Sequence, residues 1–172
     1  MRFRTPRHFI RPLRVVANIT RISLDSLRSE GVRGIVVDLD NTLVGWHHLE
    51  PSPEVADWVN RALAAGYAMA IVSNNVRAWV SSVASMLGVV TFVHGALKPL
   101  PFGIFRAVKK LRVARSEIVV IGDQLFADVL GAKLLGIRAI LTEPIVTKEH
   151  RAMRFVRSAE RFMLRGVTRD EI

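Results

Sequence analysis

Five short apolar runs, separated by segments of helical length, constrain the fold of this chain more than any other feature. Each run spans four to six residues and is made mainly of valine, isoleucine, alanine and leucine. A run of this kind is typical of a strand that is buried on both faces of a parallel sheet. The expected strands are residues 34–39, 68–72, 89–93, 118–121 and 137–141.

Helical segments fill the intervals between these strands. Ser23 and Ser52 are suitable N-cap residues, Pro53 suits the first helical position, and glycines mark most of the expected helix ends. The alternation of strands and helices predicts an α/β fold with a doubly wound, mostly parallel sheet. The chain has no repeat and no linker, so we expect a single domain over residues 1–172. The expected helices are residues 23–31, 52–66, 76–88, 101–112 and 126–136.

The two ends of the chain depart from this pattern. Residues 1–22 mix arginine with apolar side chains without a clear period, although a short amphipathic helix could follow Pro12. We expect a basic N-terminal arm that either packs across the domain or contacts a membrane surface. Residues 149–165 are expected to form a basic C-terminal helix.

Positive charge is concentrated at these ends. The net charge is +10, and residues 1–34 carry eight arginines against two acidic residues, whereas residues 35–147 carry ten basic residues against nine acids. A basic terminus can bind an anionic lipid surface or nucleic acid, and it can also serve only to keep the protein in solution.

Three absences narrow the possible chemistry and location of the protein. The chain has no cysteine, which excludes disulfides, thiolate catalysis and cysteine-based zinc sites. No uncharged apolar run approaches the roughly 18 residues of a membrane span. Arginines interrupt the apolar residues near the N-terminus, which argues against a signal peptide. A cytoplasmic protein is therefore expected, and its basic termini could hold it peripherally at a membrane.

Two aspartates stand at the end of the first apolar run. Asp38 and Asp40 are two residues apart, and side chains alternate along a strand, so both begin on the same side. Ligands bind at this carboxyl end of the strands in open α/β sheets. Two carboxylates about 4 Å apart repel each other by about 4 kcal/mol at an effective dielectric near 20. Such a pair favours a bound divalent cation or an upward shift of one pKa.

Further polar residues follow the later strands. Ser73 and Asn74 end the second strand, Asp123 ends the fourth, Asp128 lies just beyond, and Lys98 lies in an intervening loop. Right-handed crossovers bring parallel strand ends to one edge, so these groups should converge. Carboxylates suit Mg²⁺, while a serine hydroxyl, backbone N–H groups and a lysine suit a phosphate.

His47 and His48 are adjacent in the loop after the first strand. They could bind a metal, but adjacent loop histidines are more often exposed to solvent, and their role stays open.

The order of these motifs resembles the haloacid dehalogenase (HAD) superfamily. The matching stretches are Asp38-Leu39-Asp40-Asn41-Thr42, then Ser73, then Lys98, then residues 122–128. More narrowly, the chain is similar to the YqeG-like phosphatases of HAD subfamily IIIA, through residues 72–75, Lys98-Pro99 and the basic tail around residues 154–161. This resemblance covers nearly the whole chain apart from about its first dozen residues.

The resemblance implies a Mg²⁺-dependent phosphatase with an aspartyl-phosphate intermediate. Asp38 would be the nucleophile, and Asp40 would protonate the leaving group and later activate water. Mg²⁺ would be held by the carboxylates of Asp38 and Asp123 and by the backbone carbonyl of Asp40.

The remaining motif residues would hold the phosphate or support the site. Ser73, the backbone of Asn74 and Lys98 would bind the phosphate. Thr42 would brace the loop after the first strand, and Asp128 would bind the metal through water or orient Lys98.

The spacing of the motifs also bears on the substrate. No sizeable cap domain fits between residues 40 and 73 or between 73 and 98, so the site should be open to a large phosphorylated partner. The YqeG-like resemblance includes phosphatidylglycerophosphate phosphatases, which favours a lipid head group as substrate.

Two alternatives remain open. One is a phosphatase for a soluble metabolite or a nucleic-acid phosphate, although the basic arm has few aromatic residues for stacking on bases. The other is a non-catalytic binding module that keeps the fold. The sequence does not specify an oligomeric state.

Overall fold

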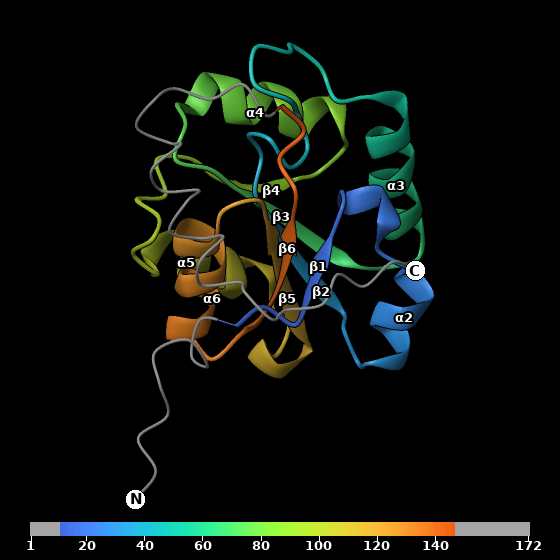
Figure 1. Cartoon of the computed structure of the whole chain (residues 1–172), viewed down its shortest axis with the longest axis vertical. Helices are drawn as coiled ribbons and strands as arrows, with labels where there is room; N and C mark the ends of the chain where they lie inside the picture. Colours follow the sequence, from blue (N-terminus) through green and yellow to red (C-terminus); the bar gives the residue numbers. More distant parts are fainter. Residues whose placement is uncertain (1–10, 147–172) are drawn as a thin grey trace, which may run out of the picture.

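The computed structural model describes residues 11–146 and has a six-stranded sheet at its centre (Figure 1). All neighbouring strands are parallel, in the order β1-β6-β5-β2-β3-β4. This sheet confirms the expected α/β fold class. The strands are β1 (Arg14–Val16), β2 (Gly34–Val37), β3 (Ala68–Val72), β4 (Thr91–Val93), β5 (Ile118–Gly122) and β6 (Arg138–Thr142).

The central strand β2 is buried on both faces. Its residue Val37 is in register with Ile71 of β3 and Ile121 of β5. Ile35 and Val37 pack into one hydrophobic core, and Val36 packs into the other. The apolar character of the whole run follows from this arrangement, because neither face of the strand meets water.

Helices cover both faces of the sheet. One core contains side chains of α2 (Leu24–Ser29), α3 (Pro53–Ala64) and α4 (Arg77–Met86), and the other contains side chains of α5 (Phe102–Leu111) and α6 (Leu130–Leu134). Figure 1 shows α2 and α3 on one side and α5 and α6 on the opposite side. Three short helical turns complete the described chain: η1 (Ile19–Arg21), η2 (Arg115–Glu117) and η3 (Leu125–Val129).

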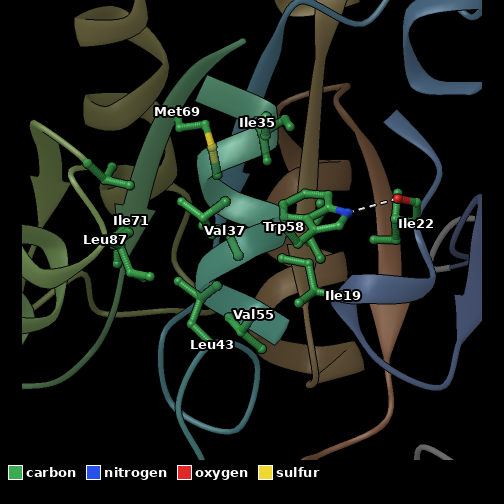
Figure 2. Packing of buried hydrophobic residues seen from close by; sticks show 14 of the residues in the cluster. Ile19, Ile22, Ile35, Val37, Leu43, Val55, Trp58, Met69, Ile71 and Leu87 are labelled. Carbon is green, nitrogen blue, oxygen red and sulfur yellow. Dashed lines mark hydrogen bonds between the residues drawn. The ribbon is translucent and has the colours of Figure 1, made fainter. Parts of the chain in front are cut away.

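Trp58 anchors α3 in its core. Its side chain is fully buried, and its indole Nε1 donates a hydrogen bond to the carbonyl oxygen of Ile22 at 2.8 Å (Figure 2). Ile19 and Ile22 belong to the same core. The segment that precedes α2 is therefore bound to the domain through α3.

The structure corrects the expectation for the residues after Pro12. They form the edge strand β1, which pairs with β6, and not a helix. Three residues are too few to show a period, and the free edge of β6 supplies the backbone partners that determine their conformation. The first ten residues of the basic arm and the C-terminal helix expected at 149–165 lie outside the described residues.

No inserted domain covers the strand ends within the described residues. A loop, α3 and β3 fill the interval from Asp40 to Ser73, and loops, α4 and β4 fill the interval from Ser73 to Lys98. Among these same residues, no helix has both the length and the apolar character needed to cross a bilayer.

Candidate active site

The residues singled out from the sequence lie at the carboxyl edge of the sheet. Asp38 directly follows β2, Ser73 follows β3, and Asp123 follows β5. Lys98 lies in the loop between β4 and α5, and its ammonium reaches Asp38. Parallel strands that end at one edge bring these four side chains together from distant parts of the sequence.

Three buried carboxylates form an acidic cluster. Carboxylate oxygens of Asp38, Asp123 and Asp128 lie within 4.8 Å of one another, and all three residues are buried. Lys98 Nζ donates to Asp38 Oδ1 and, at 2.6 Å, to Asp128 Oδ1. With three carboxylates against one ammonium, the four ionised groups carry a net formal charge of −2. Oxygen ligands with this net charge suit a hard divalent cation such as Mg²⁺.

The pKa values of Asp38 and Lys98 reflect this environment. Burial raises the pKa of Asp38 well above its usual value, the Lys98 ammonium opposes the rise, and the charges of Asp128 and Asp123 add to it. Burial lowers the pKa of Lys98, but the carboxylates of Asp128 and Asp38 outweigh it and raise this pKa overall. Lys98 therefore stays protonated, and Asp38 is ionised more readily when a cation is present.

Asp128 enters the cluster because of the turn after β5. The chain continues into η3, a π-helical turn, and the backbone N–H of Gln124 donates to Asp128 Oδ2 at 3.2 Å. The carboxyl group of Asp128 lies over Gly122, where a Cβ atom would be well inside contact distance. The ion pair between Asp128 and Lys98 supports the expected role of Asp128 in orienting that lysine, and its binding to the metal through water stays a prediction.

The carboxylate of Asp40 is held outside the acidic cluster by three donors. Ser73 Oγ donates to Asp40 Oδ2 at 2.9 Å, while Asn75 Nδ2 and Trp79 Nε1 donate to Asp40 Oδ1 at 3.3 Å and 3.1 Å. The metal role expected for Asp40 involved its backbone carbonyl and not this side chain. Asn75 and Trp79 were not predicted as site residues. By residue type and position, Asn75 suits the start of the next helix and Trp79 lies within that helix.

Ser73 and Asn74 have different contacts. Ser73 is fully buried, and its Oγ accepts from the backbone N–H of Asn75 at 2.9 Å while donating to Asp40. The side chain of Asn74 binds the backbone of Lys98 twice, accepting from its N–H at 2.7 Å and donating to its carbonyl at 3.1 Å. Asn74 therefore positions Lys98 in addition to any role of its own backbone.

Asn41 holds the loop after β2 through hydrogen bonds of its backbone and side chain. Asn41 has a positive φ of 64°, a conformation that asparagine tolerates better than most residues. Its N–H donates to the carbonyl of Val44 at 2.7 Å, and its Oδ1 accepts from the N–H of Trp46 at 3.1 Å. Thr42 is buried, but its hydroxyl makes no hydrogen bond among the described residues. His47 and His48 are exposed in this loop and are not part of the acidic cluster.

Comparison with known families and proteins gives consistent results. The sequence model of a hydrolase family described as haloacid dehalogenase-like hydrolase matches residues 6–136. The chain is 36% identical over 161 residues to the probable phosphatase YqeG of Bacillus subtilis, which covers 94% of this chain and 93% of that protein.

A second relative is the phosphatidylglycerophosphate phosphatase 1 of Arabidopsis thaliana chloroplasts and mitochondria. It is 27% identical over 176 residues, which cover 96% of this chain but 47% of the plant protein, so this chain spans about half of that relative's length.

Among solved structures, the cobalt-bound deoxy-D-mannose-octulosonate 8-phosphate phosphatase of Haemophilus influenzae has a similar fold. The TM-score is 0.53 at 17% sequence identity, and the alignment covers 79% of this chain and 89% of that one.

Proposed function

The chain belongs to the haloacid dehalogenase-like hydrolase family and is a phosphatase, and on this premise we propose that Asp38 is its nucleophile and phosphatidylglycerophosphate its substrate. Membership of this hydrolase family, together with a relative named as a probable phosphatase, favours an enzyme over the alternative of a non-catalytic binding module. The observation that carries the proposed mechanism is the buried cluster of Asp38, Asp123 and Asp128 around Lys98 at the carboxyl edge of the sheet.

The proposed reaction has two steps. A carboxylate oxygen of Asp38 forms a bond to phosphorus while the bond from phosphorus to the alcohol oxygen breaks, and Asp40 protonates the departing oxygen. Water then attacks the phosphorus of the aspartyl-phosphate, Asp40 takes the proton from water, and the bond to Asp38 breaks to release phosphate. Both steps use a carboxylate pair in which one member is a nucleophile and the other a general acid and base.

Lys98 and Ser73 are proposed to bind the phosphate. The Lys98 ammonium contacts the nucleophile, so it lies where it can offset the charge of phosphate oxygens near Asp38. The Ser73 hydroxyl has one proton and donates it to Asp40. A phosphate oxygen bound to this hydroxyl therefore takes the place of the Asp40 carboxylate, which frees Asp40 to face the leaving group.

The donor set of the cluster fits Mg²⁺. Asp38 and Asp123 provide buried carboxylate oxygens close together, and the backbone carbonyl of Asp40 is proposed as a further ligand. When bound, Mg²⁺ would offset negative charge on the phosphate and on the nucleophile. Asp128 keeps Lys98 in place beside these ligands through its ion pair.

Three features support a lipid phosphate as substrate. The 27% identical plant relative is named as a phosphatidylglycerophosphate phosphatase. No inserted domain covers the strand ends among the described residues, so a head group at a bilayer surface can approach. The basic termini of the chain suit an anionic surface, which favours peripheral membrane association.

A substrate comparison tests this proposal. The purified chain is incubated with Mg²⁺ and one of three substrates: phosphatidylglycerophosphate in vesicles, a soluble phosphomonoester or an end-phosphorylated oligonucleotide. We expect the fastest phosphate release from the lipid and no measurable release by Asp38→Asn. Turnover of the soluble ester or the oligonucleotide without turnover of the lipid would refute the proposed substrate, whereas undiminished turnover by Asp38→Asn would refute the proposed nucleophile.

A further inference from the structure

Large apolar side chains are exposed on the loops around the proposed active site. Two follow β2, one follows β3, two lie in the loop between β4 and α5, and one is the first residue of α5. All strands of the sheet are parallel, so these loops leave it from the same carboxyl edge. The six residues, called the apolar rim below, are Trp46, Leu49, Val76, Leu97, Leu100 and Phe102.

Exposed large apolar side chains are unevenly distributed over the described part of the protein. Eleven large apolar side chains are exposed among the described residues, and six of them belong to the rim. Leu49 is 77% exposed and Leu97 is 66% exposed. Single exposed apolar residues are common on protein surfaces, but a group around a functional site marks a surface that meets a partner. Val90, which is 93% exposed and precedes β4, lies at the opposite edge and stands as a natural comparison.

Hydrogen bonds connect the rim loops to one another across the site. The Asn74 side chain joins the loop of Val76 to the loop of Leu97 through two bonds to the Lys98 backbone. Ser73 and Asn75 join this pair to Asp40 and so to the β2–α3 loop. Figure 1 shows the β2–α3 loop and α4 on the same, upper side of the molecule. The rim is thus built on the same contacts that position Asp40 and Lys98.

We propose that the apolar rim inserts into the interfacial layer of an anionic bilayer, so that a lipid-borne phosphate enters the site without leaving the membrane. This inference rests on the proposed lipid substrate. Asp38 is only 6% exposed and lies at the edge from which the rim loops leave the sheet, so a head group reaches it only if this edge meets the bilayer surface. Tryptophan, phenylalanine and leucine are the side chains that bind at this layer.

The charge of the chain that continues beyond the described residues favours an anionic leaflet. The chain leaves the described residues after Val146, whose backbone N–H donates to Asn41 Oδ1 at 3.4 Å beside the same edge. Residues 147–172 carry seven basic residues against four acidic ones. Among the described residues, Arg77 is exposed next to Val76 and Glu50 is exposed next to Leu49, so these two charges offset each other. Positive charge beside an apolar surface is the combination that binds anionic lipid.

Co-sedimentation with vesicles tests the rim directly. The full chain is mixed with vesicles of phosphatidylcholine containing phosphatidylglycerol, and the bound-to-free ratio is measured for wild type, for the rim variant Leu49→Gln and for Val90→Gln. We expect the rim variant to bind about tenfold more weakly, since Leu49 loses its apolar burial in the lipid. The Val90 variant is a matched control and should bind within twofold of wild type.

A spectroscopic measurement reports insertion itself. Brominated phosphatidylcholine quenches tryptophans that enter the acyl boundary, and the chain has three tryptophans, of which Trp58 is fully buried. We expect quenching in wild type and its loss in Trp46→Phe. The rim variant should have the same circular dichroism spectrum as wild type and the same turnover of a soluble phosphomonoester. These two results show that its fold and its site are intact.

Membrane insertion of the rim and the proposed lipid substrate are tested by different results. Equal vesicle binding by wild type and the rim variant, or absence of quenching, would refute membrane insertion. A wild-type dimer that becomes monomeric in the rim variant would show that a second copy covers the rim, which also refutes it. Hydrolysis of a water-soluble, short-chain phosphatidylglycerophosphate needs no bilayer, so its failure in wild type would refute the proposed substrate and leave the binding result to stand.

Discussion

At the scale of single residues, the proposed role of Asp38 and its environment have opposite effects on its ionisation. Proposed as the nucleophile, it must be ionised, yet burial raises its pKa well above the usual value. The nearby Lys98 only partly offsets this, because Asp128 and Asp123 act in the opposite direction. The cost of ionising Asp38 in the folded state is therefore a measurable property of the metal-free protein.

The pH dependence of stability should reveal this cost. A carboxyl group with a raised folded pKa contributes stability that is fully present below its unfolded pKa, about 3.9, and lost as pH rises through the folded value. Without metal, wild type should lose stability relative to Asp38→Asn as pH rises above about 4, by up to about 1.4 kcal/mol per pH unit. Denaturant unfolding of both proteins with chelator present checks this. A difference that is constant with pH, or that changes in the opposite direction, would contradict it.

Trp79 provides a second test at the residue scale. Its Nε1 is one of three donors that hold the Asp40 carboxylate, and Trp79→Phe removes that donor while keeping an aromatic ring. Since two donors remain, we expect kcat to fall by about tenfold, the equivalent of one hydrogen bond to a charged group, with little change in KM. Steady-state kinetics on a soluble phosphomonoester measure both. An unchanged kcat would show that Asp40 does not depend on Trp79.

At the scale of elements, the turn from β5 into η3 depends on Gly122. A Cβ atom there would collide with the Asp128 side chain. Gly122→Ala should therefore cost about 1–3 kcal/mol of unfolding free energy and reduce activity by displacing Asp128 from Lys98. The cost should be smaller when Asp128→Gly is also present, because the collision is removed. A double-mutant cycle measures this difference, and strict additivity would argue against the steric explanation.

The loops after β3 and β4 are joined through Asn74. Asn74→Ala removes both hydrogen bonds to the Lys98 backbone, whereas Asn74→Asp keeps an acceptor for its N–H. We expect activity to decrease from wild type to the aspartate variant to the alanine variant, with a loss of about 10-fold to 100-fold in the last, corresponding to two hydrogen bonds. The kcat/KM for a soluble phosphomonoester gives this order. Equal activity of all three proteins would show that Lys98 is positioned without Asn74.

At the scale of the whole molecule, the acidic cluster joins separate parts of the sheet. Asp38 follows β2, Asp123 and Asp128 follow β5, and these groups are adjacent only in the folded chain. A cation that binds them stabilises the native state alone.

Mg²⁺ should therefore raise the melting temperature. At about 100 times its dissociation constant, the added stability is about 2.7 kcal/mol, which corresponds to several degrees for a domain of this size. Asp123→Asn should lose most of this shift, while Glu117→Gln, an acidic residue outside the cluster, should keep it. Differential scanning calorimetry with and without Mg²⁺ measures the shift. No shift in wild type would argue against a metal site.

The sequence by itself was sufficient to predict the parallel sheet, the edge at which the acids gather and the family. Local signals determine these features, because a strand buried on both faces must be apolar throughout and the ends of parallel strands must share an edge. Ser23 and Ser52 likewise cap helices as expected, since capping depends on residues only three positions apart.

Only the tertiary structure determined which side chains meet within the site. β1 forms because the edge of β6 offers backbone partners, which a three-residue segment cannot indicate. Asp128 joins the cluster through a π-helical turn, and Asn75 and Trp79 reach Asp40 from the following helix region. These contacts depend on side-chain directions after the chain has folded, and residue type and spacing do not encode those directions locally.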